Sequence, residues 1–98
     1  MELNNSNPYV DKDIRLLLLT ILDSDFAFAF TLTGLASTRQ EHNEPAETIR
    51  AYAESTAAGI ERLLDLADVL TEKDRRSVLG RLKELRSALA PLGYKVRG

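Results

Sequence analysis

The chain has 98 residues, of which 44% are hydrophobic and 29% are charged, and its net charge is −2 at pH 7. This composition is typical of one globular domain and excludes a disordered chain. The near-neutral total also excludes a strong overall field for nucleic acid or anionic membranes. There is no cysteine and one histidine, His42, so disulfides, thiolate catalysis and multi-histidine metal sites are excluded. We therefore expect no cofactor.

Residues 1–10 are polar and are expected to form a flexible N-terminus, followed by a single helical domain over residues 11–98. Asp11 and Asp13 suit a helix start, because carboxylates there meet unpaired amides and the positive end of the helix dipole. A first helix is predicted from about Asp11 to about Thr38. Its apolar residues point in nearly every direction, which predicts contact with protein on several sides.

The middle of this segment has two interpretations. Residues 26–33 alternate between apolar and small or polar, which is typical of a half-buried strand. A helix is preferred, because a lone strand has no pairing partner in this chain. The stretch Asp23-Ser24-Asp25 could still divide the helix and give a four-helix bundle. The same acidic residues argue against a signal peptide or membrane span over Ile14–Leu35, so we expect a cytoplasmic protein without membrane contact.

Two further helices are predicted over residues 45–70 and 71–92, folded back on each other. The earlier one has a packing seam with alternating four- and three-residue spacing, and the later one has a similar stripe. The first seam is Ile49, Ala53, Thr56, Ile60, Leu63, Ala67 and Leu70, and the second is Val78, Leu82, Leu85, Leu89 and Leu92. Thr71 with Asp74 resembles a capping box. The junction between Leu70 and Thr71 predicts a tight turn.

Charge is distributed unevenly, with net values of −4, −3 and +5 over residues 1–44, 45–70 and 71–98. Glu47, Glu54, Glu61 and Asp68 recur every seven residues, so they share one helix edge. This edge could bind a basic partner, although a solvated edge facing the basic helix is the more common arrangement. On the last helix, Arg76, Lys83 and Arg86 are the candidate partner-binding cations. The basic residues are spread around that helix with acidic ones between them, which is atypical of a phosphate-binding face.

Six large apolar side chains are the residues expected to form an interface with a partner or a second copy. They are Leu18, Leu22, Phe26, Phe28, Phe30 and Leu66. Core, a dimer interface and a ligand pocket are all compatible with the three phenylalanines. His42 lies in a polar connection and is interpreted as an ordinary solvated histidine.

The sequence therefore predicts an all-α, antiparallel bundle of three helices, or four, completed by homodimerisation. The function expected is that of a small non-enzymatic, cytoplasmic regulatory protein that binds a protein partner through helix surfaces. A nucleic-acid-binding regulator that uses the basic C-terminal helix is the main alternative. An enzyme or ligand carrier with a pocket near the phenylalanines is the third.

Overall fold

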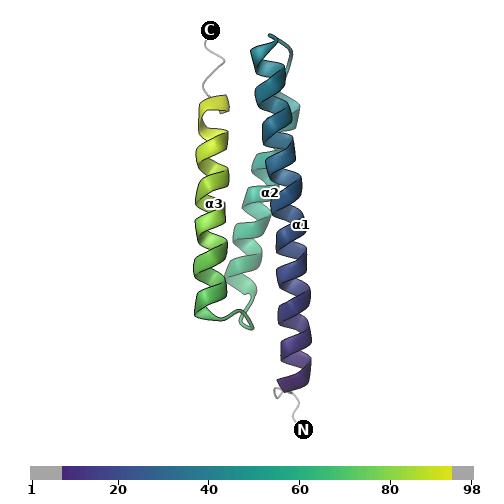
Figure 1. Ribbon diagram of the computed structural model, residues 1–98, viewed down its shortest axis with the longest axis vertical. Coiled ribbons are helices and arrows are strands. Elements are labelled where there is room, and N and C mark those ends of the chain that lie inside the picture. The colour runs from purple at the N-terminus through teal and green to yellow at the C-terminus, as the bar shows by residue number, and fades with distance from the viewer. Residues whose placement is uncertain (1–7, 94–98) are drawn as a thin grey trace.

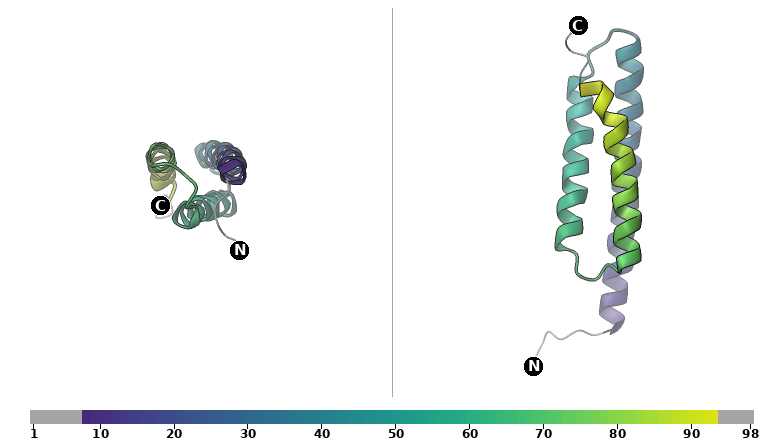
Figure 2. Two further views of the ribbon diagram at one scale, coloured as in Figure 1. Left: turned by 90° about the horizontal axis from the view of Figure 1, so that it is seen from below. Right: turned by 90° about the vertical axis from the view of Figure 1, so that its left-hand side faces the viewer.

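A computed structural model describes residues 8–93 of the chain, and three helices with two connections account for that range (Figure 1). The helices are α1 (Pro8–Glu41), α2 (Glu47–Leu66) and α3 (Glu72–Gly93). They run up, down and up, and each one contacts both others (Figure 2). The prediction of an all-α antiparallel bundle is confirmed for three helices.

The first helix is continuous over 34 residues, so residues 26–33 are helical and the Asp23-Ser24-Asp25 stretch does not divide it. Asp23 lies at the surface, where its carboxylate accepts a 2.6 Å hydrogen bond from Arg81. The helix begins three residues before the predicted start and ends three residues after the predicted end. Residues 1–7 of the expected flexible terminus lie outside the described residues. α1 is longer than its neighbours, and its N-terminal end projects beyond the α2–α3 connection (Figure 1).

The core lies along the axis between the three helices. Leu22 and Phe26 of α1, Ile60 of α2 and Leu85 of α3 are its largest fully buried side chains. Every member of the predicted α3 stripe is buried, and the predicted α2 seam is buried or partly buried throughout. Hydrophobic spacing therefore identified the inner faces of α2 and α3 correctly.

The α1–α2 corner is closed by backbone hydrogen bonds around Asn43, whose φ of 57° lies in the left-handed region. The amide of Glu44 donates to the carbonyl of Arg39 at 2.8 Å, and the amide of Asn43 donates to that of Gln40 at 3.1 Å. This pair of bonds is a Schellman motif, which commonly ends a helix with a left-handed residue. Asparagine adopts this conformation more readily than other non-glycine residues.

Asn43→Val is expected to lower the free energy of unfolding by about 1–2 kcal/mol, because a β-branched side chain clashes in the left-handed region. Asn43→Gly is the matched control and should retain the wild-type value or gain a few tenths. Thermal unfolding followed by circular dichroism would measure both variants. Equal stability of the valine variant and wild type would show that residue 43 is not held at a positive φ.

The α2–α3 corner differs from the one predicted from the sequence. α2 ends at Leu66 instead of Leu70, and Ala67 has an extended backbone with ψ of 92°. The connection thus covers residues 67–71, so the tight turn predicted between Leu70 and Thr71 is wrong. Ala67 and Leu70 remain buried in this connection, so their apolar spacing continues that of α2 although the helix has ended.

Side chains of α3 hold this corner together. Arg75 donates to the carbonyls of Leu64 at 2.8 Å and Ala67 at 2.6 Å, and so caps the C-terminal end of α2. The predicted capping box is confirmed, because Thr71 and Asp74 exchange side-chain-to-backbone hydrogen bonds of 3.0 Å in both directions. The corner therefore satisfies the ends of two helices at once.

Asp74 also joins the corner to α1. Nε of Arg15 donates to one carboxylate oxygen of Asp74 at 2.6 Å, and Nη2 donates to the other at 2.9 Å. This bidentate bond with Arg15, together with the hydrogen bonds from Thr71, holds the pKa of Asp74 well below its usual range. The pair fixes α1 against the start of α3.

Candidate interaction surface

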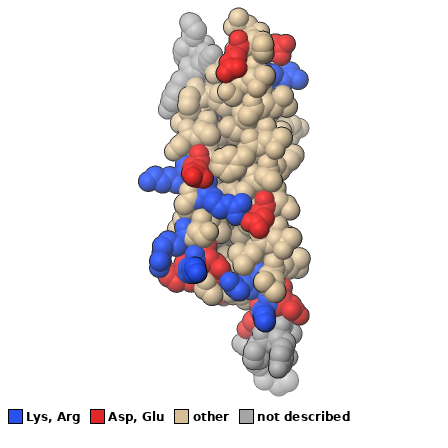
Figure 3. Space-filling model, in the orientation of Figure 1, with Lys and Arg blue, Asp and Glu red and all other residues tan. Residues whose placement is uncertain are grey.

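The side of α1 that faces away from α2 and α3 carries a continuous stripe of uncharged, exposed residues. We call this set the outward stripe: Ile14, Leu17, Ile21, Ser24, Phe28, Thr31, Leu35 and Thr38. Its members alternate three- and four-residue spacings, so they follow one face of the helix. Leu17 is 59% exposed and Phe28 is 55% exposed. Figure 3 shows charge gathered over α3 and near the ends of the molecule, with a long uncharged strip over α1.

The opposite face of α1 is anchored, and this orients the stripe toward solvent. Phe26 is fully buried, and the guanidinium carbon of Arg81 lies 4.3 Å from its ring centroid, within the range of a cation–π contact. Arg81 also pairs with Asp23, and Arg15 pairs with Asp74. α1 therefore cannot rotate its outward stripe into the bundle without breaking two ion pairs and withdrawing Phe26 from the core.

The six residues of the predicted apolar interface separate into two groups. Leu22 and Phe26 are buried in the chain's own core, and Leu18 is partly buried against it. Phe28 and Phe30 are exposed on α1, and Leu66 is 77% exposed at the end of α2. The rings of Phe26 and Phe30 are 6.4 Å apart between centroids, but Phe28 points outward. The three phenylalanines thus do not line one shared pocket.

Sequence reasoning missed four large members of the stripe: Ile14, Leu17, Ile21 and Leu35. Ile14, Ile21, Phe28 and Leu35 are each seven residues apart, which is the signal that identifies a helix face. The signal was obscured because Leu18, Leu22 and Phe26 place a second apolar face on the same helix. Only the packing of α1 against α2 and α3 separates the two faces.

The acidic register of α2 is only partly preserved. Glu54 pairs with Arg50 one turn earlier at 2.7 Å, and Glu61 pairs with Arg86 of α3 at 2.9 Å. Glu47 lies at the start of α2, whereas Asp68 lies in the α2–α3 connection. The prediction that all four carboxylates share one helix edge is therefore wrong for Asp68, because α2 ends before it.

Most of the basic side chains of α3 have partners within the described part of the chain. Arg75 donates to backbone carbonyls, Arg81 pairs with Asp23, and Arg86 pairs with Glu61. Arg76 approaches Glu72 at 3.9 Å, with both side chains largely exposed. Lys83 lies on the exposed side of α3. Across the described length of α3, this arrangement gives no concentrated cationic face.

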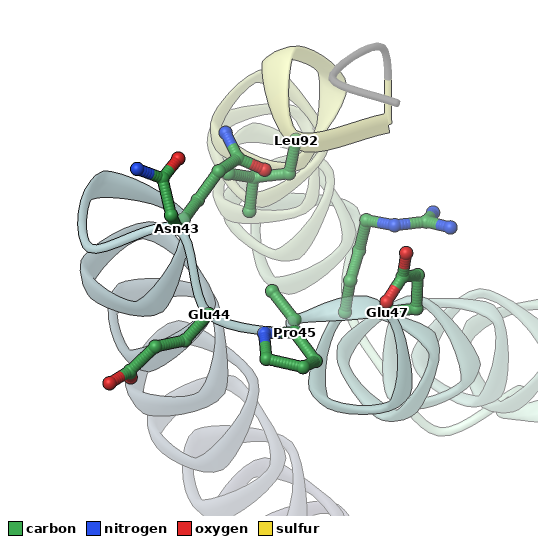
Figure 4. A pocket seen from close by; sticks show the side chains of 8 residues that line it. Asn43, Glu44, Pro45, Glu47 and Leu92 are labelled. Atoms are coloured by element: carbon green, nitrogen blue, oxygen red, sulfur yellow. The ribbon is translucent and has the colours of Figure 1, made fainter. Parts of the chain in front are cut away.

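A hollow of about 170 Å³ with a mixed polar and apolar lining lies at the α1–α2 corner, between the two helix ends and Leu92 of α3 (Figure 4). The polar residues that line it are Gln40, Asn43, Glu44, Glu47 and Arg50. Figure 4 shows the Glu44 side chain directed away from Leu92. Among residues 8–93, no group of three metal-binding side chains was found. His42 is exposed in the same connection.

The length and composition of α1 also satisfy the requirements of a membrane span, with a mean hydropathy of 1.6 over its most apolar 18-residue window. A core helix of a soluble protein and a signal sequence pass the same test, and 22% of this window is buried inside the bundle. Here Asp23 and Asp25 interrupt the segment, and ionised side chains are costly inside a bilayer. The ion pairs to α3 also hold this helix on the bundle.

No protein-family model matches the chain, and no curated protein or solved structure matches it significantly.

Proposed function

We propose that the protein is a small, non-enzymatic, cytoplasmic regulatory or adaptor protein, and that it acts by binding another polypeptide through its helix surfaces. The outward stripe of α1 is the surface assigned to this binding. The single observation that carries the proposal is that five large apolar side chains of the stripe are exposed with no charged residue among them.

The extent of the stripe supports this assignment. Five side chains of this size, each about half exposed, offer roughly 500 Å² of apolar surface along one helix. This equals the largest apolar patch of a typical monomeric protein, roughly 300–600 Å², and such a patch is often functional. The positions follow helical spacing, so the matching partner is another amphipathic helix laid along α1.

An anionic membrane surface fits the stripe less well than a protein helix does. Interfacial helices usually carry lysine and arginine beside their apolar face. α1 instead has more acidic than basic residues along its length: Asp11, Asp13, Asp23, Asp25 and Glu41 against Lys12, Arg15 and Arg39. The paired arginines of α3 likewise give no observation that favours nucleic acid as a second candidate.

A photo-crosslinking residue placed at Phe28 tests the proposal in the native host. We expect a discrete crosslinked product, because Phe28 lies near the middle of the stripe. The matched control is the same crosslinking residue at Leu79 of α3, which is 52% exposed but off the stripe and should give no such product. Equal labelling from both positions, or none from Phe28, would contradict the assignment of this surface.

A further inference from the structure

The outward stripe has a spacing that is the same in both directions along α1. From Ile14 to Thr38 the intervals are three, four, three, four, three, four and three residues. The centre of this series lies at position 26. A stripe of this kind can pair with a reversed copy of itself so that every position meets another position of the stripe, which is the requirement for a two-fold symmetric interface.

The side chains also match in size when the stripe meets its reversed copy. Ile14 faces Thr38, Ile21 faces Thr31, and Phe28 faces Ser24. Each of these pairs sets a large side chain against a small one, which lets the two surfaces interdigitate. Leu17 faces Leu35 in the remaining pair. A parallel arrangement would instead place Phe28 against Phe28 and Ser24 against Ser24, giving alternate crowding and gaps.

We infer that the occupant of the outward stripe is α1 of a second copy of this chain, packed antiparallel with its two-fold axis beside position 26. The inference rests on the proposed function, because it uses the same surface, and it names the partner. Antiparallel pairing also sets the positive end of each helix dipole beside the negative end of the other.

The area supports a second copy as the occupant. Covering the five large side chains in both copies removes roughly 1,000 Å² of apolar surface from water, which reaches the lower bound of a specific interface. Of the three polar members, Thr38 can be covered without losing a hydrogen bond, since its hydroxyl already donates to the carbonyl of Gly34 at 3.0 Å. The anchored face of α1 stays in each bundle, so the dimer forms without opening either one.

Engineered cysteines test the direction and register, because the chain has no native cysteine. The Leu17→Cys, Leu35→Cys double variant should form a disulfide-linked dimer under mild oxidation, since position 17 of each copy faces position 35 of the other. Each single variant should stay unlinked, because its two equivalent cysteines lie about 27 Å apart along the helices. Efficient linkage of a single variant, or none in the double variant, would overturn the inference.

Mass measurement gives an independent test on the uncrosslinked protein. Sedimentation equilibrium should give about twice the 10.9 kDa chain mass for wild type. Phe28→Lys should weaken dimerisation at least tenfold, while Leu79→Lys should not. Circular dichroism would confirm that both variants stay folded. A folded Phe28→Lys variant that dimerises like wild type would overturn the inference.

The failure of this inference can be distinguished from the failure of the proposed function. A monomeric wild type at high concentration overturns the second-copy inference. If the crosslinker at Phe28 then still captures a different protein, the outward stripe remains an interaction surface. If it captures nothing, the proposed function fails as well.

Discussion

Replacing Leu85 with Asp should unfold the protein at 25 °C. Leu85 is fully buried at the centre of α3, and an unpaired carboxylate at that position would lose its hydration without gaining a partner, at a cost of several kcal/mol. Removal of the leucine side chain adds a further ~2–5 kcal/mol. Together these losses reach the lower part of the roughly 5–15 kcal/mol that stabilises native proteins, and a chain of this size lies at the marginal end of that range. Far-UV circular dichroism should show loss of most helical signal and of the cooperative thermal transition.

Leu79→Asp is the matched control for this variant. Leu79 lies on the same helix, nearly two turns before Leu85, and is 52% exposed. A charge there stays hydrated, so the free energy of unfolding should change by about 0.5 kcal/mol or less. A folded Leu85→Asp variant with wild-type helicity would show that the inner face of α3 is wrongly placed.

Asp74→Ala should lower the free energy of unfolding by about 2–3 kcal/mol at pH 7. The substitution removes one of the two bonds of the capping box, the one donated by the amide of Thr71, worth ~1 kcal/mol, and two charge-assisted hydrogen bonds from Arg15. It also leaves a half-buried guanidinium without its partner. Urea denaturation at pH 7 would measure the change. Arg15→Ala is the control that keeps the capping box, so it should cost less than Asp74→Ala.

The same residue makes stability depend on pH. The pKa of Asp74 is lowered in the folded state, whereas in the unfolded chain it is near the ordinary value of ~3.9. Between these values the unfolded state binds the proton more tightly, so stability is lost as the pH falls below about 4. The Asp74→Ala variant should lose less stability than wild type between pH 5 and pH 2. An identical slope for both proteins would contradict the stabilising role of this carboxylate.

The inner faces of α2 and α3 could be predicted from sequence because each of these helices has one apolar face. The apolar residues from Val78 to Leu92 follow a spacing that indicates one helix face, and all five of them are buried. α1 differs, because it has apolar residues on two faces. Their spacing alone therefore does not show which face lies in the core. The contact of Phe26 with Arg81 settles that question, and it depends on residues 55 positions apart.

Helix ends were less predictable than helix faces. Thr71 and Asp74 gave a correct local signal, since both partners of a capping box lie within one turn. The end of α2 gave no such signal, because its cap is the side chain of Arg75, which reaches back from α3 to Leu64 and Ala67. The predicted continuation to Leu70 failed for that reason.

The contacts at the α2–α3 corner differ in how far apart in sequence their partners lie, and this has a kinetic consequence. Bonds from Arg75 and within the Thr71–Asp74 box join residues at most 11 positions apart, whereas Arg15 and Asp74 are 59 apart. Short loops close at lower entropic cost, so the bonds within the α2–α3 corner are expected to form before the Arg15–Asp74 pair. The Arg15–Asp74 pair then forms after the transition state for folding. Its removal should therefore raise the unfolding rate more than it lowers the folding rate.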